Sequence, residues 1–508
     1  MLPFLNLQRV FKPGHLVMVG LEGTKLDPQQ AQFLRSQGLR AVCLFRSNLG
    51  SAEEVRQLTT ALRGVMGPGA LIAVDQEGGA TSRAQFLPQA PSAMCLGAAG
   101  NPILADQVGA AVSRGLRSLG FNWNFAPVLD VNNNPLNPVI GERSFSQDPA
   151  AVARMAGAWM RGALHERVAC CVKHFPGHGD THVDSHLALP TVDKSLSELL
   201  MLELLPFHKL RLDAPAMMTA HIVYPQLDPA HPATLSRVIL RDLLRDTWKY
   251  KGVIITDSLV MKAIHDRYGH HAAAPMALRA GADMVMALGT PAEQAQAVQA
   301  LQDGLDDGSL SAREMFRSRR RLDDLALRYP AEIGVYSDEM RESDEQLMHR
   351  AWADGLCTVG LAEPPRPGTR LRVITQRSVA SDQVSEAGVP AQRVVRVFDG
   401  FDDVVLEQVD DLAQLDWQAL PQDDRFTVLV SNSRVRYGTQ AAHWRPDLHI
   451  VLWNPFQVLD VCAPALVSWG YANGALDAVQ AWLAGTPANG RSPVTLLIPA
   501  PGGPAASV

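Results

Sequence analysis

Residues 151–177 read AVARMAGAWMRGALHERVACCVKHFPG and contain one complete helix-to-strand unit. Apolar residues recur at helical spacing over the first part, AVARMAGAWMRGALHE, which predicts an amphipathic helix. The run ACCV that follows is apolar without alternation, as in a strand that is buried on both faces. It ends in two polar residues, Lys173 and His174. Buried strands that alternate with helices in this way are typical of parallel sheets.

The same alternation recurs through the first two-thirds of the chain. Apolar runs of strand length are separated by amphipathic segments such as EEVRQLTTALRGV (53–65). Eight such units within roughly 330 residues predict a (β/α)8 barrel. A doubly wound open sheet has the same local pattern, so that alternative stays open at this point. The predicted strands are residues 16–23, 41–45, 71–79, 121–131, 169–177, 216–224, 252–260 and 282–289.

A polar stretch around residues 328–346 interrupts this pattern, and a second α/β pattern follows it. We therefore predict a barrel domain at residues 1–335, a linker at 336–346 and a smaller open α/β sandwich domain at 347–508. The tail of the second domain, PAPGGPAASV, is predicted to be disordered. The strands predicted in this domain are residues 370–376, 393–400, 426–432, 448–455, 465–471 and 494–499.

The composition argues against several classes of protein. Of the 508 residues, 47% are hydrophobic and 19% are charged, and the net charge is −6. A nucleic-acid partner would need a basic patch, and the one basic cluster, RSRRRLD (317–323), is typical of a solvated helix face. No apolar run is long enough to span a membrane, and the N-terminus lacks the pattern of a secretion signal. The six cysteines are scattered, which fits a reducing compartment, so we expect a cytoplasmic protein.

Polar residues follow the apolar strands at the same end of each strand. In a (β/α)8 barrel the carboxyl ends of all strands meet at one face, and that face carries the active site. One such residue could have a purely structural role; Asp257, for example, could cap the next helix. Because several strands contribute, we expect a shared site. The residues concerned are Asp75, Glu77, Arg83, Asp130, Glu142, Arg143, Lys173, His174, Thr219, His221 and Asp257.

Four histidines recur at every fourth position in KHFPGHGDTHVDSH, residues 173–186. On a helix this spacing is typical of a metal site, but Pro176 and the glycines beside it disfavour a helix, so no metal or other cofactor is expected. Asp184 and His186 are two residues apart and point to the same side of an extended segment. The carboxylate can then orient the imidazole as a general acid/base. Asp257 is a candidate nucleophile for an anomeric carbon.

These motifs resemble glycoside hydrolase family 3, and within it the two-domain β-N-acetylglucosaminidases of the cell-wall (peptidoglycan) recycling type. The resemblance rests on DQEGG (75–79), FAPVLDV (125–131), IGERSF (140–145), KHFPGHGDTHVDSH and TDSL (256–259), in family order. It implies a retaining double displacement with Asp257 as the nucleophile, His186 as the general acid/base and Asp184 as the partner of that histidine. The sugar-binding residues that it implies are Asp75, Arg83, Arg143, Lys173 and His174.

The resemblance further implies a small carbohydrate substrate, namely terminal β-linked N-acetylglucosamine on muropeptide fragments. Two positions depart from the family pattern. ATSRAQ (80–85) keeps the arginine but lacks the aromatic residue after it, and TDSL has a serine where many relatives have a second aspartate. A neutral histidine base does not repel an anion, so transfer of the sugar to phosphate stays an alternative. So do a glucoside preference and a catalytically silent sugar-binding protein.

Overall fold

Eight parallel strands close into a barrel in the first part of the chain. The computed structural model describes residues 11–184, 189–382, 384–421 and 423–500. Each barrel strand lies within one of the eight predicted runs, and the closed sheet rules out the doubly wound alternative. In the order of their pairing, the strands are β1 (Val17–Val19), β12 (Met284–Met286), β11 (Val253–Ser258), β8 (Ala216–Thr219), β7 (Ala169–Phe175), β6 (Trp123–Asn124), β3 (Leu71–Val74) and β2 (Ala41–Leu44).

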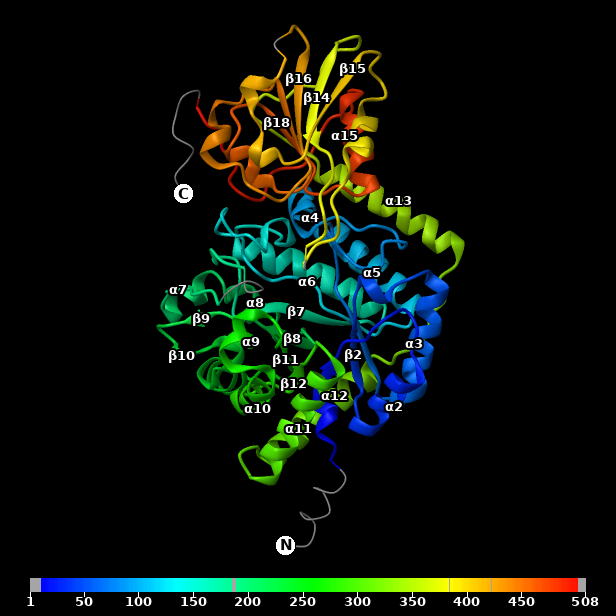
Figure 1. Ribbon diagram of the computed structural model, residues 1–508, viewed down its shortest axis with the longest axis vertical. Coiled ribbons are helices and arrows are strands. Elements are labelled where there is room, and N and C mark those ends of the chain that lie inside the picture. The colour runs from blue at the N-terminus through cyan, green and yellow to red at the C-terminus, as the bar shows by residue number, and fades with distance from the viewer. Residues whose placement is uncertain (1–10, 185–188, 383, 422, 501–508) are drawn as a thin grey trace.

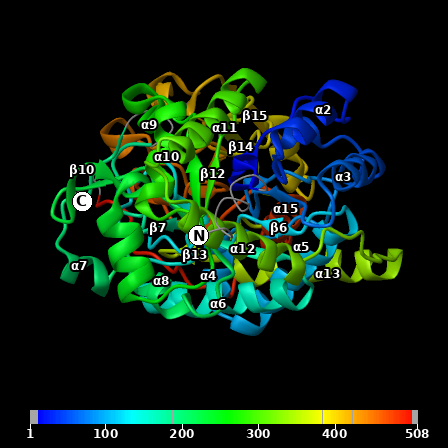
Figure 2. The ribbon, with the colours of Figure 1, turned by 90° about the horizontal axis from the view of Figure 1, so that it is seen from below.

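Helices surround the barrel, as the view from below shows (Figure 2). Several begin at a residue that caps the free N–H groups of the first turn. At α3, Ser51 Oγ accepts a hydrogen bond from the Glu54 N–H, while a Glu54 carboxylate oxygen accepts one from the Ser51 N–H at 2.8 Å. The helical segments are α2 (Pro28–Gln37), α3 (Ala52–Met66), α4 (Ala93–Ala99), α5 (Pro102–Ser118), α6 (Pro149–His165), α7 (Leu196–Met201), α8 (Leu205–Leu210), the π-helical η5 (Val238–Thr247), α9 (Lys262–Tyr268), α10 (His270–Ala280), α11 (Pro291–Asp306) and α12 (Ala312–Arg328).

Helices α5 and α6 approach each other closely because each has a glycine at the contact. A Cβ atom on Gly109 of α5 would lie 2.0 Å from the carbonyl oxygen of Trp159, and one on Gly162 of α6 would lie 1.9 Å from that of Asp106. Real Cβ atoms do not approach this closely, so a larger residue would force the helices apart. The contact helps to position β7, the strand that follows α6 and carries Lys173 and His174.

The second domain contains a six-stranded sheet in the order β13-β18-β17-β16-β14-β15. Alternate side chains of its central strands enter different apolar clusters: Val428 and Val430 join one, and Leu429 joins the other. Both faces of the sheet are therefore covered, as expected for a layered α/β domain. Its elements are α13 (Asp338–Gly355), β13 (Cys357–Val359), β14 (Leu371–Gln376), α14 (Ala391–Val394), β15 (Val404–Val409), β16 (Phe426–Ser431), β17 (Leu448–Val451), β18 (Ala465–Val467) and α15 (Asn473–Leu483).

Two of the predicted strands in this domain are wrong. Residues 393–400 form the end of α14 and a 3-10 helix, η6 (Val395–Phe398). The buried residues Val394, Val397 and Phe398 follow helical spacing, which the apolar character of the run had hidden. Residues 494–499 are not a strand either, because their backbone lies against the barrel domain, where the Thr495 N–H donates to the Gln147 side chain at 2.8 Å.

The structure also bears on the segments between and after the two domains. Most of residues 336–346, predicted as a linker, belongs to helix α13, which begins at Asp338. The domain boundaries themselves stay a prediction. The predicted disordered tail extends beyond the described residues from position 501 onward. Among the described residues, no helix is both long and apolar enough to cross a membrane.

The second domain lies above the barrel and contacts it through helix α4 (Figure 1). Met94 and Cys95 of α4 share an apolar cluster with Trp352 and Trp469 of the second domain. Polar contacts accompany this cluster: Ser92 Oγ donates to the Trp469 carbonyl at 2.8 Å. A buried apolar interface of this kind favours a fixed arrangement of the two domains.

Candidate active site

A pocket of about 470 Å³ opens at the carboxyl ends of the barrel strands. Its walls combine ionisable side chains with large apolar ones, including Phe45, Phe125, Met218 and Met286. This is the face on which barrel enzymes carry their active sites. Six of the eight residues predicted from the sequence line this one pocket: Asp75, Arg83, Arg143, Lys173, His174 and Asp257.

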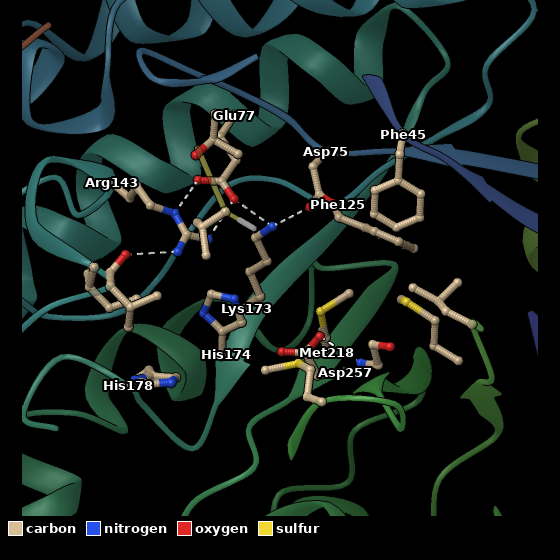
Figure 3. Close-up of a pocket in the computed structure, with 18 of the residues that line it drawn as sticks. Phe45, Asp75, Glu77, Phe125, Arg143, Lys173, His174, His178, Met218 and Asp257 are labelled. Carbon is tan, nitrogen blue, oxygen red and sulfur yellow. Dashed lines mark hydrogen bonds and ion pairs between the residues drawn. The ribbon is translucent and has the colours of Figure 1, made fainter. Parts of the chain in front are cut away.

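Lys173 lies between two carboxylates in the wall of the pocket (Figure 3). Its Nζ is 2.6 Å from Asp75 Oδ1 and 2.6 Å from Glu77 Oε1. Burial lowers the pKa of Lys173, but Asp75 and Glu77 outweigh burial and raise it above its usual value. The lysine is therefore a permanent cation that holds both carboxylates in place.

Arg143 forms a two-pronged ion pair with the same glutamate. Its Nε and Nη2 each lie 2.8 Å from a carboxylate oxygen of Glu77, and its Nη1 donates to the Val139 carbonyl at 3.0 Å. Burial raises the pKa of Glu77, but Arg143 and Lys173 lower it far more, so the net shift is downward. Glu77 therefore stays ionised and fixes the orientation of both cations.

Asp130 orients His174 from below the pocket. The Asp130 carboxylate accepts hydrogen bonds from the backbone N–H of His174 at 3.2 Å and of His178 at 2.7 Å, and its second oxygen lies 2.7 Å from His174 Nδ1. Burial raises the pKa of Asp130, but the two histidines lower it further, so the group is a carboxylate. A carboxylate only accepts hydrogen bonds, so Nδ1 of His174 is the donor and Nε2 is left for a ligand.

The regular spacing of the histidines has a structural explanation for His178 and His182. His178 is buried, and its Nδ1 lies 2.8 Å from Thr181 Oγ1. Burial and the neighbouring His174 lower its pKa to about 4, so it is neutral at pH 7. His182 lies 3.2 Å from Asn134 Nδ2. Within the described part of the chain, no group of three His, Cys, Asp or Glu side chains is arranged to hold a metal ion.

Asp257 lies at the end of β11 and faces the pocket near Met218 (Figure 3). Its Oδ1 accepts a hydrogen bond from the Ser258 N–H at 2.7 Å. His221 Nε2 lies 2.9 Å from the Ser258 carbonyl and thereby braces the same strand end. A partly exposed carboxylate at a braced strand end can approach a bound substrate as a nucleophile.

Comparison with known proteins identifies the family of this chain. Residues 11–325 match the profile described as the glycosyl hydrolase family 3 N terminal domain. The chain belongs to glycosyl hydrolase family 3. The predictions of a glycoside hydrolase and of a barrel followed by an α/β domain are confirmed.

Individual family 3 relatives cover different parts of the chain. A solved structure of a glycoside hydrolase family 3 beta-N-acetylglucosaminidase from Paenibacillus sp. str. FPU-7 is similar over 96% of this chain and 99% of that chain, with a TM-score of 0.87 and 30% identity. Beta-hexosaminidase from Pseudomonas aeruginosa (strain LESB58) is 37% identical over 56% of this chain and 86% of its own length. Beta-hexosaminidase A from Pseudoalteromonas piscicida is 36% identical over 60% of this chain, and the match spans only 56% of that protein.

Of the predicted acid/base pair, only Asp184 belongs to the residues that the structure describes. Asp184 is half-buried and is not among the residues that line the pocket. His186 lies outside the described residues. Both roles stay predictions.

Several residues of the site were missed or left without a role by the sequence reasoning. Glu77 and Asp130 were recognised as polar strand-end residues, but their roles as partners of Arg143 and His174 depend on distances in space. Val384, from the second domain, also lines the pocket. It shares an apolar cluster with Val139 of the barrel domain. No local sequence signal identifies such a contact across domains.

Proposed function

We propose that the protein is a retaining exo-β-N-acetylglucosaminidase that removes terminal β-linked N-acetylglucosamine. The observation that carries the proposal is the convergence of Asp257 with the charged set Asp75, Lys173, Arg143 and Glu77 in one pocket. The name of the Paenibacillus relative, a beta-N-acetylglucosaminidase, supports this sugar, and that of the Pseudomonas relative, a beta-hexosaminidase, supports the wider class of hexosamines.

The charges of the pocket suit an uncharged sugar ring. Its described lining residues include three carboxylates and three permanent cations, which are Asp75, Glu77, Asp257, Arg83, Arg143 and Lys173. The ion pairs fix donors and acceptors before substrate arrives, so hydroxyl and amide groups can be bound with little reorganisation. A pocket of about 470 Å³ has the size of a small-ligand site, which supports cleavage at a chain end.

In the proposed first step, a carboxylate oxygen of Asp257 attacks the anomeric carbon. The bond from that carbon to the leaving oxygen breaks, and His186 gives a proton to this oxygen. In the second step, a water molecule gives a proton to His186 while its oxygen displaces Asp257 from the anomeric carbon. Two inversions give net retention, and Asp184 orients His186 throughout.

The proposed natural substrates are muropeptide fragments, which would place the reaction in the cytoplasm. All six cysteines are free thiols, which is compatible with a reducing compartment.

The proposal is tested with 4-nitrophenyl N-acetyl-β-glucosaminide and the matching glucoside. Wild-type protein should cleave the first substrate and not the second, and Asp257→Ala should lower kcat by roughly a thousandfold or more. Asp266→Ala, which removes an exposed carboxylate on the following helix, should leave kcat unchanged. His186→Ala should lose less activity, because nitrophenolate leaves without a proton. A wild-type protein inactive on the N-acetylglucosaminide, or an active Asp257→Ala variant, would contradict the proposal.

The acceptor of the sugar is tested separately by product analysis. With and without phosphate in the buffer, the proposed hydrolase should release only free N-acetylglucosamine. Formation of a sugar 1-phosphate would show that phosphate is the acceptor.

A further inference from the structure

A short segment of the second domain, residues 384–386, reaches the pocket of the barrel. In Figure 1 the chain after β14 descends from the second domain towards the barrel. The Glu386 N–H donates to the Ala80 carbonyl of the barrel domain at 2.9 Å, and the Tyr471 hydroxyl donates to the Glu386 carbonyl at 3.1 Å. The backbone at Glu386 is therefore held from both domains.

Arg83 is the barrel residue to which this segment binds. Arg83 Nη1 lies 2.7 Å from Glu386 Oε1, and Nη2 donates to the Val384 carbonyl at 2.9 Å. The side chains of Arg83 and Glu386 are only 8% and 10% exposed. Burial lowers the pKa of Arg83, but Asp75 and Glu386 outweigh burial and raise it, so the guanidinium stays charged.

The barrel domain alone does not fix the orientation of this guanidinium. Among the described residues, both hydrogen bonds that the guanidinium donates go to the second domain. Its buried Nε has no hydrogen-bond partner among those residues in either domain. A long arginine side chain without such partners samples many rotamers, and ordering it on substrate binding would cost entropy. The second domain therefore orients Arg83 before substrate binds.

The same region of the second domain also supports the loop that carries Arg143. Val384 shares an apolar cluster with Val139 and Ile140, and the Val139 carbonyl accepts a hydrogen bond from Arg143. Trp453 Nε1 donates to Glu142 Oε1 at 2.8 Å. Contacts between the domains thus reach Arg83 directly and Arg143 through the loop that carries it.

We propose that Glu386 is a positioning residue of the glycosidase site, acting through Arg83, and that the second domain thereby completes the sugar pocket of the barrel. The inference rests on the proposed function, because it names a determinant of that same site. If the ion pair were purely structural, loss of the Glu386 carboxylate would lower stability alone. A positioning role predicts that it also weakens sugar binding.

The test compares Glu386→Gln with a matched control in the full-length protein. Asp344→Asn removes the charge of a second buried carboxylate that pairs with a barrel arginine, Arg114, away from the pocket. We expect Glu386→Gln to lower kcat/KM about tenfold, mainly through a higher KM, because the Arg83 side chain must then be ordered when the sugar binds. Asp344→Asn should stay within about twofold of wild type even if its Tm falls. Equal kinetic parameters for Glu386→Gln and wild type would overturn the proposal.

A double-mutant cycle shows whether Glu386 acts through Arg83. In an Arg83→Lys background, Glu386→Gln should change kcat/KM by less than about twofold, because the geometry that it supports is already lost. A loss as large as in the wild-type background would overturn the proposal.

Calorimetric titration with N-acetylglucosamine distinguishes failure of the proposed function from failure of the role proposed for Glu386. If the wild type cleaves no aryl glycoside, the proposed function fails, and binding alone tests the role of Glu386. About tenfold weaker binding by Glu386→Gln than by wild type supports that role. Equal binding by the two proteins, or no binding by the wild type, overturns it.

Discussion

Glu77 is the residue whose neutralisation should disturb the pocket most. Its side chain is only 7% exposed and makes three charge-assisted contacts, two with Arg143 at 2.8 Å and one with Lys173 at 2.6 Å. In Glu77→Gln, one oxygen can still accept a hydrogen bond, but the new NH2 group points a donor at a cationic donor. Lys173 then keeps Asp75 as its acidic partner, whereas Arg143 loses its ion pair.

The expected cost follows from that geometry. Breaking a buried ion pair typically destabilises a protein by about 3–5 kcal/mol. For a domain of this size, 1 kcal/mol corresponds to about 2 °C in Tm, so the barrel transition should fall by about 6–10 °C. The kcat/KM for the N-acetylglucosaminide should fall about 10-fold to 100-fold, because Lys173 and Arg143 lose their orientation.

The assay is differential scanning calorimetry combined with steady-state kinetics. Glu166→Gln is the matched control, because the ion pair of Glu166 with Arg114 is more exposed, with the Glu166 side chain 27% exposed. Such pairs contribute about 0–1 kcal/mol, so its Tm should fall by at most about 2 °C. A Glu77→Gln protein that melts within this range and keeps full activity would refute the reasoning.

The difference in Tm between wild type and Glu77→Gln should depend on pH. The pKa of Glu77 is lower in the folded protein than its ordinary value of 4.5, because Arg143 and Lys173 outweigh the effect of burial. Its stabilisation is therefore fully present above that ordinary value and is lost as the pH falls towards the lower folded value. The Tm difference between wild type and Glu77→Gln should be constant from pH 5.5 to 7 and should narrow below about pH 4.5. A difference that widens on acidification would contradict this sign.

Two further substitutions test parts of the scaffold. Asp130→Asn can place an NH2 group opposite His174 Nδ1. It should lower kcat/KM at least about tenfold in steady-state kinetics and lower stability by about 1.5–3 kcal/mol in thermal melting. Unchanged kinetics would show that the tautomer of His174 does not matter for activity. Gly162→Ala puts a Cβ atom 1.9 Å from the Asp106 carbonyl oxygen and should destabilise the protein by about 1–3 kcal/mol or more through the α5–α6 contact. Gly64→Ala in α3 is the control, because its Cβ atom meets no atom within 4 Å, and it should stabilise the protein by about 0.4–1 kcal/mol. Equal melting temperatures for the two variants would contradict the close helix contact.

The strands and the polar residues at their ends could be predicted from the sequence because both are local. A strand buried on both faces shows as an uninterrupted apolar run, and all eight barrel strands were located in this way. Since the carboxyl ends of barrel strands meet at one face, Asp75, Lys173 and Asp257 were expected together before any distance was known. The strand prediction was wrong for two segments whose conformation depends on the surrounding structure. Residues 393–400 are apolar enough for a strand but are helical, and residues 494–499 find their partners on the barrel.

By itself, the sequence determined the alternation of strands and helices, the presence of a second α/β domain and the charged residues that line the pocket. Only the tertiary structure decided which charges are paired, namely Glu77 with Arg143 and Lys173, and Asp130 with His174. It also decided that Arg83 is bound by Glu386, which lies 303 residues away in the chain. The physical reason is that strand and helix patterns depend on neighbours in sequence, whereas an ion pair depends on a distance of about 3 Å that the packing of whole domains sets.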